Sequence, residues 1–120
     1  MVAQQQEDRI FAGHAPIHTP QLTVRAEGSS IVLLVSGEVD MATAPTVQEC
    51  LDGVMADCSG SVIVDLGGVT FLDSSGIAVL VRAHCQLQGA ARDLGIRNPT
   101  PIVRGVLTVT GIDDLVVDPA

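Results

Sequence analysis

The 120-residue sequence predicts a single α/β domain with a mixed, mostly parallel sheet of four to five strands. Dense runs of β-branched and aliphatic residues at positions 31–35 and 61–66 indicate buried strands. Apolar residues at helical spacing follow each of these runs. Because strands that alternate with helices are typical of parallel sheets, we expect the order β-β-α-β-α-β-α-β, with an N-terminal β-hairpin.

The hairpin is expected from the first regular pattern in the chain. Leu22 and Val24 alternate with polar neighbours as in a half-buried strand, and a turn at residues 27–30 leads into the run at 31–35. The run at 31–35 is continuously apolar, and the run at 61–66 is densely β-branched and aliphatic. This pattern predicts strands that are covered on both faces.

Three helices are expected from stripes of apolar residues at helical spacing. The first covers about residues 42–57. The second covers about residues 74–88, is followed by Gly89, and has a stripe made of Ile77, Leu80, Val81, His84 and Leu87. The third has Asn98 as its N-cap, Pro99 as its first residue and Gly111 at its end. Its expected buried residues are Ile102, Val103, Val106 and Leu107.

The remaining strands are short or interrupted by glycine. The run at 61–66 is expected to end at Gly67–Gly68, and residues 69–72 bring the chain to a boundary at Asp73. Residues 93–97 and 115–117 predict two further short strands.

Charge and composition exclude several classes of function. The six basic residues are all arginine and face 14 acidic residues, which gives a formal net charge of −8 and makes a nucleic-acid platform improbable. The absence of lysine excludes a Schiff-base enzyme and a phosphate-binding P-loop. Phe11 and Phe71 are the only aromatic residues, so surfaces for base stacking are missing. No apolar run is long enough to span a membrane.

Cys50, Cys58 and Cys85 are an odd number of cysteines without the paired spacing of a zinc site. A disulfide framework is therefore not expected. Cys50 and Cys85 are interpreted as small buried residues on helices, while redox control through the three cysteines stays open as an alternative.

The segment Asp73-Ser74-Ser75-Gly76 carries the most chemical information, because it follows a buried strand and begins the second helix. The first-turn amides of a helix lack partners, and its N-terminus is positive. A phosphate on a serine there would be favoured by the helix and opposed by Asp73. From spacing alone, the simpler interpretation that Ser74 only caps the helix stays open.

Three stretches, in order, resemble bacterial anti-sigma factor antagonists of the STAS domain family. They are residues 37–40 with the following Ala44-Pro45, residues 62–77 around the Asp-Ser-Ser-Gly loop, and residues 106–113 at the close of the third helix. The resemblance extends over about residues 21–117 and fits the strand and helix order inferred from the residues themselves.

The resemblance implies that Ser74 accepts phosphate from an anti-sigma factor that is itself a serine kinase, with Ser75 as a secondary hydroxyl. The unphosphorylated form would bind this kinase and free its sigma factor, phosphorylation at Ser74 would release it, and a PP2C-type phosphatase would reset the switch. The implied partner-binding residues are Asp40, Asp73, Ser74, Ser75 and Gly76. The partner binds the ATP, and no cofactor or metal of this chain is implied.

The sequence departs from the family pattern at both ends. Family members usually continue into a C-terminal helix, which is expected here to be missing or shortened in a STAS domain of residues 21–120. A sheet edge left uncovered would favour self-association. Residues 1–20 are expected to be a flexible extension, whose role the resemblance does not address.

An enzyme is not expected, because His84 lies about 15 Å along the helix from Ser74, and Asp40, Asp65 and Asp73 form no calcium-type ligand loop. A STAS scaffold or small-ligand sensor without a phosphoswitch remains the alternative. No signal peptide is visible, so we expect a cytoplasmic regulator of transcription in a stress response.

Overall fold

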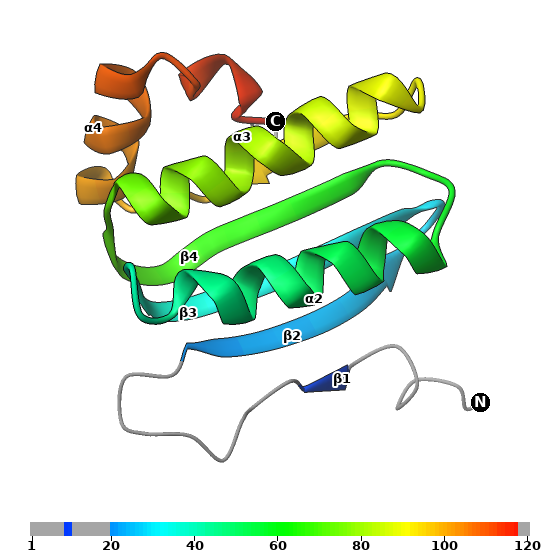
Figure 1. Cartoon of the computed structure of the whole chain (residues 1–120), viewed down its shortest axis with the longest axis horizontal. Coiled ribbons are helices and arrows are strands. Elements are labelled where there is room, and N and C mark those ends of the chain that lie inside the picture. Colours follow the sequence, from blue (N-terminus) through cyan, green and yellow to red (C-terminus); the bar gives the residue numbers. More distant parts are fainter. Residues whose placement is uncertain (1–8, 11–19, 118–120) are drawn as a thin grey trace.

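A computed structural model of the chain describes residues 9–10 and 20–117 (Figure 1). The elements, in chain order, are β1 (Arg9–Ile10), β2 (Gln21–Glu27), β3 (Ser30–Val39), α2 (Ala44–Asp57), β4 (Val62–Leu72), α3 (Ser74–Gly89), β5 (Leu94–Arg97), α4 (Pro101–Thr110) and the 3-10 helix η1 (Asp113–Leu115). This order confirms the predicted α/β domain as far as α4.

The five strands form one mixed sheet in chain order, from β1 to β5. β2 and β3 form the predicted antiparallel hairpin around Gly28, whose φ of +61° suits a glycine. β3, β4 and β5 are parallel neighbours. The sequence predicts an end to the strand at Gly67–Gly68, but β4 runs on to Leu72. Two register shifts along β3 accommodate this longer strand.

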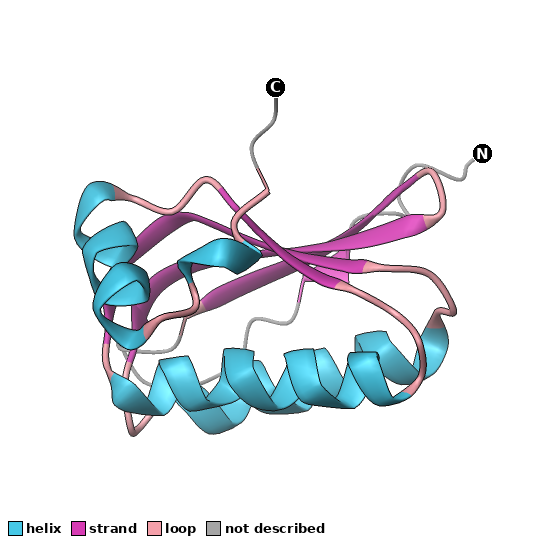
Figure 2. Ribbon diagram, turned by 90° about the horizontal axis from the view of Figure 1, so that it is seen from above, coloured by secondary structure: helices cyan, strands magenta, loops and turns pink. Residues whose placement is uncertain are grey.

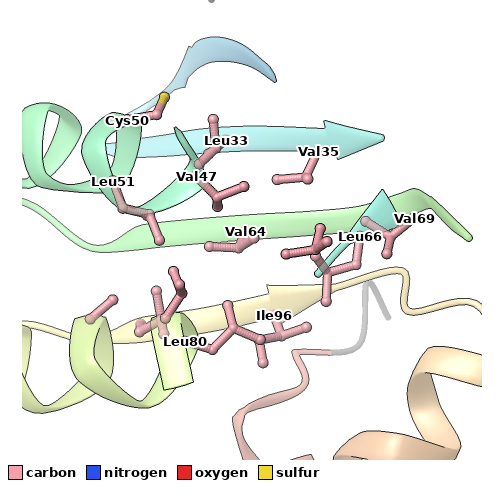
Figure 3. Packing of buried hydrophobic residues seen from close by; sticks show 14 of the residues in the cluster. Leu33, Val35, Val47, Cys50, Leu51, Val64, Leu66, Val69, Leu80 and Ile96 are labelled. Carbon is pink, nitrogen blue, oxygen red and sulfur yellow. The ribbon is translucent and has the colours of Figure 1, made fainter. Parts of the chain in front are cut away.

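Helices α2 and α3 both pack on one face of the sheet (Figure 2). Figure 3 shows how Leu51 of α2 and Leu80 of α3 meet Val64 and Ile96 of the sheet, and all four are 3% exposed or less. No aromatic residue belongs to this core within the described chain. The burial of aliphatic surface between the helices and the sheet is the main force that holds the domain together.

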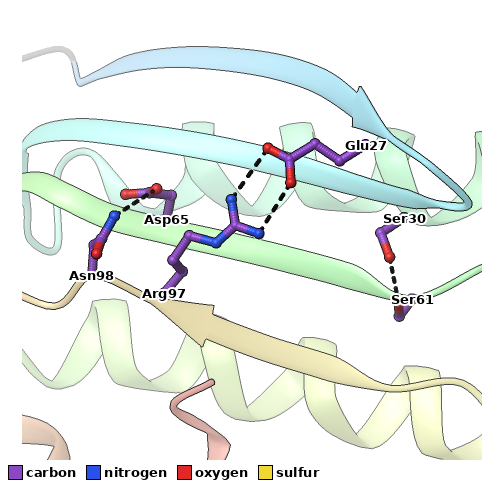
Figure 4. Close-up of polar contacts among 6 residues, drawn as sticks. All are labelled: Glu27, Ser30, Ser61, Asp65, Arg97 and Asn98. Atoms are coloured by element: carbon purple, nitrogen blue, oxygen red, sulfur yellow. Dashed lines mark hydrogen bonds and ion pairs between the residues drawn. The ribbon is translucent and has the colours of Figure 1, made fainter. Parts of the chain in front are cut away.

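The opposite face of the sheet differs from the prediction that strands would be covered on both faces. Here Glu27 of β2 and Arg97 of β5 reach over the two strands between them and form a bidentate ion pair, with distances of 3.1 and 3.2 Å (Figure 4). Val32 is only 1% exposed, although it alternates along β3 with Leu33 and Val35, which face the helices (Figure 3). Its cross-strand neighbours are Arg25 and Ile63. The apolar run of β3 therefore reflects burial beside long side chains, not beside a second helix layer.

The start of α4 lies later than predicted. Thr100 is the N-cap, with its Oγ1 accepting a hydrogen bond from the N–H of Val103 at 3.4 Å, and Pro101 is the first helical residue. The predicted cap, Asn98, has a φ of +56° and belongs to the preceding turn, together with Pro99. The two Pro-containing pairs are similar in sequence, which is why the pattern pointed to the earlier one.

Some predicted core positions are exposed. Val81 is 38% exposed because the buried stripe of α3 runs through Ala83 instead. Ile102 is 69% exposed because α4 buries only Val103 and Leu107. α4 lies at the end of the sheet where β4 ends, so only a narrow stripe of this helix meets the core (Figure 1).

The ends of the described chain also differ from the prediction. The predicted strand at 115–117 is reduced to a single parallel bridge between Val116 and Ile96, because η1 uses the chain up to Leu115 in a tight turn. β1 was not predicted. It lies inside the expected extension of residues 1–20 and pairs with β2. Pro20, the last residue of that extension, is buried next to Gly37. Residues 1–8 and 11–19, and the expected loss of a C-terminal helix, lie outside the described residues.

Gly76 fixes how closely α3 approaches the sheet. A Cβ atom at this position would collide with Cδ1 of Leu72 and would lie 2.9 Å from Cγ1 of Val39. The first turn of α3 therefore rests directly on the last residues of β3 and β4. A larger residue would force the side chains of Leu72 and Val39, or the helix itself, to shift.

We expect Gly76→Ala to lower the free energy of unfolding by about 1–3 kcal/mol, because the added methyl group overpacks this contact. Urea denaturation followed by circular dichroism measures the change. Gly105→Ala in α4 is the matched control, since a Cβ atom at that position would have no other atom within 4 Å and alanine favours a helix by up to about 1 kcal/mol. Equal effects of the two substitutions would contradict the close approach at Gly76.

We expect Arg97→Met to raise the pKa of Glu27, because the hydrogen bonds from Arg97 hold that pKa below its usual range. A lowered carboxyl pKa stabilises the fold above the unfolded pKa and ceases to do so as the pH falls through the folded value. The variant should therefore lose part of its stability at neutral pH and show less change on acidification. An NMR titration measures the pKa of Glu27 in Arg97→Met and in the control Arg104→Met. The prediction is contradicted if Arg97→Met leaves this pKa unchanged, as the control should.

Candidate functional site

The turn after β3 is organised by Asp40 and Thr43. Asp40 Oδ1 accepts hydrogen bonds from the backbone N–H groups of Ala42 and Thr43, both at 3.0 Å. The Thr43 hydroxyl accepts from the N–H of Asp40 and donates to the carbonyl of Glu38, both at 2.9 Å. This arrangement holds an Asx-type turn before α2. Asp40, predicted as a partner-binding residue, therefore also shapes the loop that presents it.

Asp73 caps α3. Its Oδ1 accepts hydrogen bonds from the N–H groups of Ser75 at 2.8 Å and Gly76 at 3.2 Å. The interpretation left open by the sequence, that Ser74 caps the helix, is wrong. Ser74 is the first helical residue, its side chain is exposed, and no hydrogen bond to its hydroxyl comes from the part of the chain that the structure describes.

The two loops meet because β3 and β4 are parallel neighbours. Val39 pairs with Leu72, so Asp40 and Asp73 each follow the last residue of adjacent strands. The N–H of Asp73 also donates to the carbonyl of Val39 at 3.2 Å. The carboxyl ends of strands are where open α/β sheets commonly place binding sites. The predicted carboxylates and serines therefore lie at one end of the sheet.

The residues of the Asp-Ser-Ser-Gly loop are exposed to different degrees. Ser74 faces solvent, Ser75 is half-buried and lines a groove, and Gly76 is buried. Ser74 is thus the accessible hydroxyl of the loop. Gly76, predicted to bind a partner, is a buried residue in the first turn of α3, and its role in binding stays a prediction.

A shallow groove of about 420 Å³ separates the first turns of α2 and α3. Its lining is mainly apolar, with Arg82 as the charged member: Met41, Ala44, Pro45, Gln48, Ser75, Ala78, Val79 and Arg82. Because Ser75 lines the groove next to Ser74, a protein that covers Ser74 would also cover the groove.

The apolar part of this surface was not predicted from the sequence motifs. Met41 is 78% exposed and Phe71 is 47% exposed, and they lie close in the chain to Asp40 and Asp73. Of these two residues, Met41 lines the groove, and a large exposed apolar side chain at a groove is typical of protein-binding surfaces. Met41 follows Asp40 in a turn rich in small and polar residues, and this position is the signal that could have identified it.

Among the described residues, no serine–histidine pair forms at this end of the sheet. His84 lies ten residues along α3 from Ser74 and lines a separate pocket with Asp93 and Asp114. Its Nδ1 is buried without a hydrogen-bond partner in the described part of the chain. Across residues 9–10 and 20–117, no group of three metal-ligating side chains is found.

The three cysteines are free in the structure. Cys50 is buried as predicted, but the prediction for Cys85 is wrong, because it lies on the exposed side of α3. Cys58 is half-buried at the end of α2, where Arg92 donates to its Sγ at 3.0 Å and to the carbonyls of Met55 and Gly60. Arg92 thereby ties the end of α2 to the turn after α3.

None of the described helices combines the length and apolar character that a membrane span needs.

Comparison with solved structures gives several matches to anti-sigma factor antagonists. The antagonist from Mycobacterium paratuberculosis is 28% identical, with a TM-score of 0.76 over 88% of this chain and 91% of that one. The anti-sigma factor antagonist SpoIIAA in its unphosphorylated form, a Bacillus protein, is 20% identical, with a TM-score of 0.72 over 82% of this chain and 88% of that one. The latter likeness concerns the fold alone.

The same fold occurs inside a larger protein. The murine anion transporter of the Solute Carrier 26 family is 15% identical, with a TM-score of 0.65, and the match covers 90% of this chain but 19% of the transporter. Curated protein sequences gave no significant match. The family model described as "Mlab, STAS domain" matches residues 22–117. The chain therefore belongs to the STAS domain family.

Proposed function

We propose that the chain is an anti-sigma factor antagonist and that phosphorylation of Ser74 switches its binding. The observation that carries the proposal is the exposed Ser74 hydroxyl, which stands at the start of α3 between two aspartate-bearing loops and beside an apolar groove. The similarity in fold to known antagonists supports the same role, and so does the resemblance of the Asp-Ser-Ser-Gly segment to the family's pattern. In this role the chain binds a partner and catalyses no reaction.

The partner is a cytoplasmic anti-sigma factor that is itself a serine kinase and holds the ATP. The γ-phosphoryl group moves from ATP to Ser74 Oγ, a new O–P bond forms, the bond to the β-phosphate oxygen breaks, and ADP and the hydroxyl proton leave. A PP2C-type phosphatase hydrolyses the ester and restores the hydroxyl. This cycle frees the sigma factor only while Ser74 is unmodified.

Electrostatics explain how the modification would release the partner. A phosphate adds a charge of about −1.5 to −2 near pH 7. Asp73 lies next to Ser74 in the chain, Asp40 lies on the adjacent loop, and the formal net charge is already −8. A partner that tolerates the neutral hydroxyl would then have to desolvate a dianion beside like charges, which opposes binding.

The groove between α2 and α3 is the second part of the proposed docking surface. It is continuous with Ser75 and carries Met41 at its edge. Its apolar lining favours an apolar side chain of the partner, and Arg82 favours a neighbouring carboxylate. The remaining surface, rich in aspartate and glutamate, favours a partner whose rim is basic.

A second candidate is a STAS unit that acts as a scaffold or small-ligand sensor without a phosphoswitch. The description of the matching family model names Mlab, and the transporter match covers only part of a long chain, so STAS units also serve within larger assemblies. Tandem mass spectrometry after incubation with ATP and each candidate kinase of the host separates the two. An added mass of about 80 Da on Ser74 supports the switch, whereas no modification by any kinase favours the scaffold or sensor.

We expect Ser74→Ala to bind the anti-sigma partner as tightly as the native chain and to resist release by ATP. Ser74→Glu should weaken binding by roughly tenfold or more, because the carboxylate places a permanent charge in the contact. Ser59→Glu is the matched control, since Ser59 is exposed beyond the far end of α2. Isothermal titration calorimetry measures all three affinities, and equal values for Ser74→Ala and Ser74→Glu would remove the switch.

We expect Ala78→Gln to weaken partner binding by roughly tenfold, because the longer side chain fills the groove between α2 and α3. The fold should be unchanged, since Ala78 is exposed. Ala56→Gln makes the same change on an exposed alanine near the other end of α2 and should leave the affinity as it is. An unaltered affinity of Ala78→Gln would show that the groove is not part of the contact.

A further inference from the structure

Two of the amide groups that would attract a phosphate at the start of α3, those of Ser75 and Gly76, are already occupied. One oxygen of the Asp73 carboxylate accepts from the N–H of Ser75 at 2.8 Å and from that of Gly76 at 3.2 Å. These are two of the first-turn donors that give a helix N-terminus its affinity for anions. A phosphate on Ser74 thus meets donors that a neighbouring carboxylate has taken.

The backbone around this cap has little freedom to change. Asp73 donates its N–H to the carbonyl of Val39, and its own carbonyl accepts from the N–H of Ile77 at 3.0 Å. On the inner side, Gly76 lies against Leu72 and Val39 without room for a Cβ atom. The backbone hydrogen bonds of Asp73 and the packing of Gly76 thus hold the cap in place. The Asp73 carboxylate can bond to the Ser75 and Gly76 N–H groups without any movement of the backbone.

We propose that Asp73 is a positioning residue for the phosphorylated form: by holding the Ser75 and Gly76 N–H groups, it denies them to a phosphate on Ser74 and keeps the dianion directed outward. The inference rests on the proposed modification of Ser74 and assigns the direction of the new charge. A phosphate bound back onto its own helix would be partly neutralised by the N–H donors. A phosphate turned outward meets the partner with its full charge.

Two variants of Asp73 distinguish its role as a hydrogen-bond acceptor from the effect of its negative charge. Asp73→Ala removes the carboxylate and frees both N–H groups for the phosphate. Asp73→Asn keeps an oxygen that accepts from the same N–H groups but removes the negative charge. Asp40 on the neighbouring loop and Glu38 near the end of β3 are present in every variant, so their effect on the phosphate is constant.

The test uses the full chain with phosphoserine installed at position 74 by genetic encoding, so no kinase is needed. 31P NMR measures the second pKa of the phosphate, and 1H-15N spectra follow the Ser75 and Gly76 amides during the same titration. In the native chain we expect a phosphate pKa at or above its ordinary value of about 6, with both amides unaffected by the titration. In Asp73→Ala we expect the pKa to fall by about 1 and both amides to move downfield with the phosphate.

Asp73→Asn should lower the phosphate pKa less than Asp73→Ala and should leave the Ser75 and Gly76 amides unaffected. The proposal is overturned if these amides follow the phosphate titration in the native chain, because the phosphate would then have displaced Asp73. It is also overturned if Asp73→Ala and the native chain titrate alike. Should Asp73→Ala fail to fold, the native chain and Asp73→Asn still decide the question.

This test and the test of the proposed function fail separately. Kinase treatment with mass spectrometry asks whether Ser74 is modified, whereas the NMR titration asks where an installed phosphate points. A phosphate that folds back onto α3 would leave Ser74 as the site of modification and would remove only the role assigned to Asp73.

Discussion

The contact between Gly76 and the paired ends of β3 and β4 is the constraint on which the site depends. Val39 and Leu72 are register partners in parallel strands, and the first turn of α3 rests on both of them. The N–H of Asp73 completes the join by bonding to the carbonyl of Val39. Without this close approach, the loops that carry the two aspartates would not share one surface, and the groove between the helices would have no fixed width.

Both aspartates of the site accept hydrogen bonds from backbone N–H groups of their own loops. Asp40 shapes the turn before α2, and Asp73 caps α3. Asp73 precedes Ser74 in the chain and Asp40 lies on the adjacent loop, so both stabilise the local fold and add negative charge to this end of the sheet. The same two side chains thus hold their loops in shape and, in the proposed switch, would oppose a phosphate on Ser74. Asp40 and Asp73 therefore contribute both to the shape of the two loops and to the negative charge of the site.

The sequence predicts most of the fold, because long apolar periodicities identify β2 to β5 and the three helices. It predicts less where two signals compete. Two similar Pro-containing pairs follow each other before α4, and the sequence does not show that the second contains the N-cap, Thr100. The apolar run of β3 predicts cover on both faces, but on one of them the structure has the ion pair of Glu27 and Arg97. Family resemblance locates the Ser74 loop. Local pattern does not reveal that Asp73 is the cap or that Met41 is exposed, since both depend on how the two loops meet in space.

The tight seat of α3 has a kinetic consequence. A surface that is already in its binding shape loses little conformational entropy when a partner arrives, so association resembles the docking of two rigid bodies. Among variants of such an interface, affinity differences are expressed mostly in how long the complex lasts. A phosphate on one hydroxyl of this fixed surface would therefore act mainly on the dissociation rate. It would shorten the lifetime of the complex without any rearrangement of the domain.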